Sequence, residues 1–160
     1  MISKIMQKMI ISSNGSMRDI NHFLKVWAYA KNIGEAEHLD EKTKFILEIA
    51  AIVHDIACPS LRARYGCCDG KLQEKEGPEL AENFLKEFKL SEEYVDRVTY
   101  LVGHHHSTEN VDGLDYRILL EADYLVNADE SKYSRENIEN TYNTVFRTET
   151  GRKLLSSMYF

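Results

Sequence analysis

The sequence has few of the residues that interrupt helices and no excess of basic charge. Only 2 prolines and 8 glycines occur in 160 residues, so the chain offers few natural breakpoints to regular structure. The 20 Lys+Arg are outnumbered by 26 Asp+Glu, which gives a net charge of −6 with neutral histidine. That balance argues against a protein that coats nucleic acid through a basic face. A mostly helical domain is the first prediction.

Long apolar runs and a targeting segment are also lacking. The most apolar stretch, residues 46–57, is interrupted by three polar residues and is much shorter than the ~20 residues that cross a bilayer. The cysteines are few and odd in number: Cys58, Cys67 and Cys68. We therefore expect free thiols, a reducing compartment and a cytoplasmic protein without a membrane partner.

What is present fits one ordinary globular unit. Hydrophobic residues make up 43% and charged residues 29% of the chain, the proportions of a typical folded domain. At this length a single compact domain over residues 1–160 is expected, and it can bury a sizeable core.

Apolar residues recur at helical spacing in most of the chain, and strand patterns are nearly absent, so the predicted fold class is all-α, a compact helical bundle. The expected helices cover residues 19–32, 40–53, 78–85, 91–102, 115–127 and 135–146, followed by a short amphipathic tail. The second of these is apolar on nearly every side from Ile49 onward, which places it in the middle of a bundle. Residues 59–77, which carry Gly66, Gly70 and paired cysteines, are expected to form a long ordered loop, a kind of segment that often carries function.

Four polar residues stand in apolar helical settings where packing does not need them. His54 and Asp55 end the most apolar helix, and burying such a pair is costly unless it is hydrogen-bonded or bound to a metal. Taken alone, the pair is more typical of an ordinary core histidine and a helix-end aspartate with ordinary hydrogen bonds. His22 lies where a helix–turn–helix hairpin would bring it opposite His54, and Asp123 interrupts another apolar helix. Two imidazoles and two carboxylates form a nitrogen and oxygen set suited to Fe, Mn, Zn, Ni or Co.

In their order and helical context, these four residues resemble the H…HD…D pattern of the HD-domain superfamily of metal-dependent phosphohydrolases. The resemblance covers a core of about residues 19–127, with C-terminal helices at 131–160. It implies a helical bundle of the HD-domain type in which His22, His54, Asp55 and Asp123 bind one divalent metal ion. It also implies hydrolysis of a phosphoester, often that of a nucleotide.

Members that hold two metals add a histidine in a motif resembling His-x-x-x-Gly and one or two more near Ile-x-x-His-His. Residues 101–106 contain the second element, but Gln73 stands where the first would have its histidine. A second metal site at His104, His105 and Gln73 is therefore only possible, because an amide is a poor replacement for imidazole. His106 also fits a solvated helix end, where histidines favour the negative pole of the helix dipole.

The leading hypothesis is hydrolysis by metal-activated water. Asp55 or Asp123 would orient the water, and His104 or His105 would protonate the leaving oxygen or hold a second ion, because histidine titrates near neutrality.

Three cations are candidates for binding substrate phosphate. Lys25 and Arg18 lie one turn on either side of His22, and Arg62 lies in the expected loop. Each one taken alone is more typical of a solvated surface residue. Together they suit an acidic protein that must attract a small phosphorylated substrate locally.

Two other functions remain open from the sequence. Proteins with this scaffold include some that resemble di-iron oxygenases, which cleave C–C or C–P bonds with O2, although Gln73 weakens that interpretation. A non-catalytic module that senses a nucleotide is the third hypothesis, and the intact primary ligands argue against it.

Overall fold

The computed structural model describes residues 1–160 and confirms the all-α prediction: there are nine α-helices, one 3₁₀ turn and no strand. The helices are α1 (Ile2–Ser12), α2 (Met17–Ala36), α3 (Glu41–Val53), α4 (Cys58–Tyr65), α5 (Gly70–Leu85), α6 (Glu92–Val102), α7 (Leu114–Glu130), α8 (Arg135–Thr144) and α9 (Glu149–Tyr159), and the 3₁₀ turn is η1 (Lys86–Phe88).

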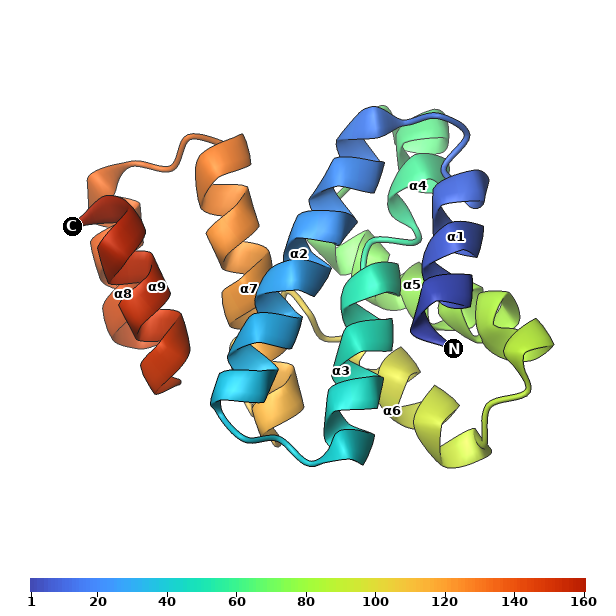
Figure 1. Cartoon of the computed structure of the whole chain (residues 1–160). Coiled ribbons are helices and arrows are strands. Elements are labelled where there is room, and N and C mark those ends of the chain that lie inside the picture. Colours follow the sequence, from blue (N-terminus) through green and yellow to red (C-terminus); the bar gives the residue numbers. More distant parts are fainter.

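Three helices form the centre of the bundle. α2, α3 and α7 pack against one another, α1 and α6 cover α3, and α5 packs on α6. Figure 1 shows α8 and α9 side by side beyond α7, on the side of the molecule away from α1. The C-terminal pair therefore extends the bundle at α7, the helix that carries Asp123.

Burial follows the apolar pattern. In α3 every residue from Ile49 to Val53 is fully buried, as the sequence predicts. α7 is buried nearly all around, because α2 and α3 lie on one side of it and α9 on another. Asp40 starts α3 by accepting a hydrogen bond from the backbone N–H of Thr43 at 3.0 Å.

The expectation of a long loop at 59–77 is wrong, because most of this segment is helical. α4 ends at Gly66, which adopts the left-handed conformation (φ 75°) of a helix C-terminus. Asp69 then caps α5, since its carboxylate accepts hydrogen bonds from Lys71 N and Leu72 N at 3.0 and 3.1 Å. Pro78 lies inside α5 and not at its first turn. Gly66 and Asp69 are therefore the end of one helix and the start of the next.

Two further expectations need correction. The N-terminal helix α1 was not predicted, although Ile5 and Met9, four residues apart, are buried against the core. Cys58 and Cys68 form a disulfide with a Cα–Cα distance of 5.1 Å, so the prediction of free thiols is wrong for both. Only Cys67 is free, and it is exposed. None of the helices has the length and apolar character needed to cross a membrane.

Candidate metal centre

The four residues of the predicted motif come from the three central helices. His22 lies in the second turn of α2, beside the buried stripe that includes Phe23. His54 and Asp55 follow the last residue of α3, and Asp123 lies in the middle of α7. Because these helices pack on one another, the four side chains meet in the interior of the bundle.

Their polar atoms converge closely. His22 Nε2 lies 3.1 Å from Asp123 Oδ1, 3.2 Å from His54 Nε2 and 3.4 Å from Asp55 Oδ2. His54 Nε2 lies 3.4 Å from Asp123 Oδ1 and 3.6 Å from Asp55 Oδ2. His54 is fully buried, and His22 and Asp123 are each less than a tenth exposed. The sequence pattern thus corresponds to one compact cluster.

The outer ring nitrogens fix which atoms face the cluster. His54 Nδ1 donates to the carbonyl of Ala51 at 2.9 Å, because a carbonyl can only accept. His22 Nδ1 lies 2.8 Å from the carboxylate of Glu130 and donates to it in the same way. Both Nε2 atoms therefore point inward, next to carboxylate oxygens of Asp55 and Asp123. So many acceptor atoms in one buried place repel one another unless a proton or a cation lies between them.

The electrostatics of the protein without a cation favour protons there. Burial alone would lower the pKa of His22, but its hydrogen bond to Asp123 and the charges of Asp123 and Asp55 raise it to about 9. Burial also opposes the charged form of His54, yet Asp55 and Asp123 raise its pKa. Against the effect of burial, the neighbouring imidazoles hold the pKa of Asp55 and Asp123 well below the usual range of a carboxyl group.

The spacing also fits a metal ion. Ligand atoms about 2.1 Å from one cation stand about 3.0 Å apart in an octahedral shell and about 3.4 Å apart in a tetrahedral one. The observed separations run from 3.1 to 3.6 Å. The donor set of two imidazoles and two carboxylates, together with this spacing, fits a divalent transition metal.

A second group of ligand atoms adjoins the first. Atoms of Asp55, His105 and His106 lie within 4.8 Å of one another. His105 Nδ1 donates to the carbonyl of Val102 at 2.8 Å, which turns its Nε2 toward Asp55 Oδ1 at 3.4 Å. That Nε2 is buried and has no hydrogen-bond partner. Asp55 thus presents one oxygen to each group, an arrangement that could hold two cations.

The triple-histidine segment, residues 104–106, is held in place by contacts with α5 and α7. Glu74 accepts hydrogen bonds from His106 N at 3.0 Å and from Ser107 Oγ at 2.9 Å. The hydroxyl of Tyr116 donates to the carbonyls of His104 and Ser107 at 2.8 and 2.6 Å. Gly70 lies so close to this segment that a Cβ there would stand 3.0 Å from the His106 ring. These contacts fix the orientation of His105 and His106.

Gln73 is buried on the same face of α5 as Gly70, Glu74 and Gly77, the face that packs on residues 102–106. Its Nε2 donates to the carbonyl of Cys68 at 3.4 Å, and its buried Oε1 has no partner. Orphaned buried oxygens are rare in proteins, so this atom is available to an ion or a water. Gln73 does not belong to the second group of ligand atoms, and its role as a metal ligand stays a prediction.

The other predicted site residues lie outside the cluster. The ring of His104 stacks on Tyr100 at 4.2 Å, and its Nδ1 donates to the Tyr100 carbonyl at 2.7 Å. His104 is therefore brought together with aromatic side chains and not with the ligand groups.

The three predicted phosphate-binding cations have different positions. Lys25 forms an ion pair with Glu130 at 2.5 Å and so adjoins the cluster through His22. Arg62 is paired with Asp19. Arg18 is exposed and makes no ion pair.

Sequence reasoning missed Glu130, which contacts the cluster, and left open whether His106 belongs to the site. Glu130 lies seven residues after Asp123, two turns along the same face of α7, which is the pattern that could have indicated it. His106 was assigned to solvent as readily as to the site, because an exposed helix end and a ligand position look alike in sequence. Glu130 holds the ring of His22 as carboxylates hold metal-bound histidines.

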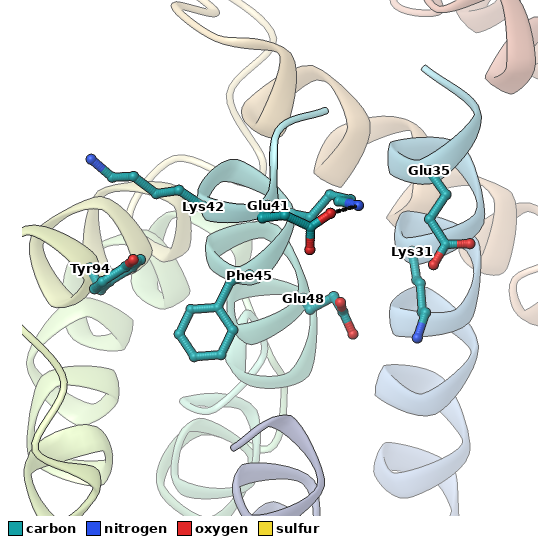
Figure 2. Close-up of a pocket in the computed structure, with 8 residues that line it drawn as sticks. Lys31, Glu35, Glu41, Lys42, Phe45, Glu48 and Tyr94 are labelled. Atoms are coloured by element: carbon teal, nitrogen blue, oxygen red, sulfur yellow. Dashed lines mark hydrogen bonds and ion pairs between the residues drawn. The ribbon is translucent and has the colours of Figure 1, made fainter. Parts of the chain in front are cut away.

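A surface pocket lies between α2, α3 and α6, away from the cluster. It measures about 600 Å³ and is formed by residues from α2, α3 and α6: Lys31, Glu35, Glu41, Lys42, Lys44, Phe45, Glu48 and Tyr94. Figure 2 shows that α3 contributes Glu41, Phe45 and Glu48 to it. Phe45 precedes His54 by nine residues, about 13 Å along the helix. Two of its lysines, Lys42 and Lys44, are paired with Glu93 and Glu41, and none of its residues belongs to the predicted motif.

The comparisons with known proteins agree with this geometry. The model of the HD domain family matches residues 19–131, and the chain belongs to that family. The matched range includes every residue of both ligand groups, from His22 to Asp123, and Glu130 as well. Most of the family are metal-dependent hydrolases that bind divalent metal ions. No curated protein and no solved structure matches the chain.

Proposed function

We propose that the protein is a metal-dependent phosphohydrolase that cleaves a phosphoester of a small molecule, with a nucleotide as the expected substrate. The observation that carries the proposal is the convergence of two imidazole nitrogens, of His22 and His54, on carboxylate oxygens of Asp55 and Asp123 at 3.1–3.6 Å. Membership of a family of mostly metal-dependent hydrolases supports the same reaction class.

His22, His54, Asp55 and Asp123 would hold the cation. When bound, it polarises a phosphoryl oxygen and lowers the pKa of a bound water toward ~7. Asp55 stands between the two ligand groups and is placed to orient that water and accept its proton. His105 Nε2 makes no hydrogen bond within the protein, and when the ring is protonated this nitrogen can donate a proton to the leaving oxygen. Water is consumed, and phosphate and an alcohol are released.

The test combines metal content with turnover. We expect wild-type protein purified without chelators to contain a transition metal and to release phosphate from members of a phosphoester panel. Asp123→Asn, close to isosteric, should lose both. His54→Asn should do the same, whereas His38→Asn, at an exposed position with φ 57°, serves as the matched control and should lose neither. Full activity of Asp123→Asn, with its fold verified by circular dichroism, would refute the proposal.

One observation favours a second candidate function, that of a di-iron oxygenase. Asp55 faces both ligand groups, as a bridge between two irons would. Oxygen consumption by the iron-loaded protein, without phosphate release from any ester, would favour that function. A nucleotide-dependent rise in melting temperature without turnover would indicate a sensing module.

A further inference from the structure

A pocket beside the candidate metal centre has walls that suit an organic group and not an anion. It encloses about 220 Å³ between α7, α8 and the triple-histidine segment. Asp123, His105 and His106 form the end that belongs to the two ligand groups. An ester whose phosphate reaches those groups would therefore place its alcohol in this pocket.

No lysine or arginine lines the pocket. Its ten residues are His105, His106, Thr108, Leu120, Asp123, Tyr124, Asn127, Tyr133, Thr141 and Val145. Phosphate groups in proteins are matched by Arg, Lys or metal ions, so a second phosphate would have no counter-charge here. Of the three predicted phosphate-binding cations, Lys25 and Arg62 are paired with Glu130 and Asp19, and Arg18 does not line the pocket.

The walls offer a flat aromatic surface and one free amide. Tyr133 is more than a third exposed, and its ring lies 5.5 Å from that of Tyr124. The hydroxyl of Tyr124 is committed to Asn137, which leaves its ring as the contact surface. Asn127 lies one turn after Asp123, is half-buried, and its side chain makes no hydrogen bond within the protein. An amide that donates and accepts matches the edge of a nucleobase, and an aromatic ring stacks on its face.

The size of the pocket limits what enters. A volume of 220 Å³ lies below the ~300–1,000 Å³ of pockets for drug-sized ligands. One ring system with its substituents fits this space better than a dinucleotide or a polyphosphate chain.

We propose that the α7–α8 pocket binds the uncharged, ring-bearing alcohol of a phosphate monoester, a nucleoside, and that Asn127 and Tyr133 are its specificity-determining residues. The assignment rests on the proposed hydrolysis of a phosphoester. It adds a prediction about charge: a nucleoside monophosphate is preferred to the diphosphate and triphosphate of the same nucleoside.

Binding of the free nucleoside tests the pocket without any turnover. Adenosine and cytidine are titrated into metal-free protein and followed by saturation-transfer NMR and calorimetry. Tyr133→Leu and Asn127→Leu should weaken the binding about tenfold or more, as expected for loss of base stacking or of the amide contact. Tyr65→Leu and Asn32→Leu, at exposed helical positions away from the pocket, are the matched controls and should bind as wild type does.

Steady-state kinetics then tests the predicted preference for a nucleoside monophosphate. We expect kcat/KM for the nucleoside monophosphate to exceed that for the diphosphate and triphosphate about tenfold or more. The two pocket variants should lose about tenfold more on the monophosphate than on glycerol 3-phosphate, which has no ring, with the loss in KM and not in kcat. Ribose 5-phosphate separates a sugar pocket from a nucleoside pocket, and preference for it would overturn the assignment.

The two proposals fail in different ways. Nucleoside binding that both pocket variants abolish, without hydrolysis of any ester, would sustain the pocket assignment and refute the hydrolase. Ester hydrolysis with equal losses on all substrates in the pocket variants, or with preference for triphosphates, would leave the hydrolase intact and overturn the pocket assignment.

Discussion

Protons and a metal ion compete for the same nitrogen of His22, and this competition gives a measurable prediction. Asp123, Asp55 and Glu130 raise the pKa of His22 to about 9 against the effect of burial. A metal ligand must be unprotonated, so binding has to release the proton. At pH 7.5 a group with a pKa of about 9 carries about one proton, whereas an ordinary histidine carries only ~0.1.

We therefore expect binding of Zn²⁺ or Mn²⁺ at pH 7.5 to release about one proton or more, with His54 adding to the total because its pKa is raised as well. The measurement is calorimetry in two buffers of different ionisation enthalpy, repeated from pH 6.5 to 10. Apparent affinity should rise with pH up to about 9, and the release should then fall toward zero. Binding at pH 7.5 without proton release would refute the electrostatic reasoning.

Glu130→Gln sharpens the test. The amide keeps a hydrogen-bond partner near His22 Nδ1 but removes the charge, so the pKa of His22 and the proton release should both fall. Loss of such an outer partner costs about 10–100-fold in metal affinity. Asp129→Asn is the matched control, because Asp129 is the preceding residue of α7, exposed, and paired only with Lys132. Identical behaviour of the two variants would show that Glu130 does not act through His22.

The raised pKa of His22 also predicts how the stability of the metal-free protein changes with pH. Because the pKa of His22 is raised on folding, its contribution to the stability of the metal-free protein is fully present below about pH 6.5 and is lost as the pH rises through about 9. The melting temperature of metal-free protein should therefore fall over this range. Saturating metal should remove the fall, since the nitrogen is then no longer protonated.

Three changes test the packing around the site. Glu121→Ala, which removes a fully buried acceptor of three hydrogen bonds from the segment before α9, should lower the free energy of unfolding by about 3–5 kcal/mol in urea titrations, and Glu121→Gln by less. Reduction of Cys58–Cys68, which closes a loop of sequence separation 10, should cost up to ~3 kcal/mol, and an unchanged denaturation midpoint would contradict the pairing. Gly77→Ala should cost about 1–3 kcal/mol, because its Cβ would stand 2.8 Å from Val102 Cγ1.

The central helices could be predicted from sequence because their burial is periodic or complete. From Ile49 onward α3 is apolar on every side, and most residues of α7 are buried, which is why both helices lie inside the bundle. The four motif residues were singled out because polar groups in such helices need a partner, and the structure brings all four together. Their role in metal binding stays a prediction that the experiments above address.

The residues that sequence reasoning missed depend on three-dimensional context. A glutamate at the end of a helix, such as Glu130, is usually solvated, and only the position of His22 on α2 gives it a partner. The partner of Cys58 is equally hidden, because it depends on how the turn between α4 and α5 folds back. Gly66 and Asp69 were assigned to a loop since helix ends and loops use the same residues.

The position of Asp55 explains why the histidine–aspartate pair stands at the end of a helix. Within a continuous helix, adjacent side chains project about 100° apart and do not serve one cluster well. After Val53 the regular helix gives way to a turn over residues 54–57, closed by hydrogen bonds from Ile56 N to the Val53 carbonyl at 3.0 Å and from Cys58 N to the Asp55 carbonyl at 2.9 Å. The turn lets Asp55 direct one oxygen to His54 and the other to His105. The end of α3 therefore places Asp55 where its two oxygens contact both groups of ligand atoms.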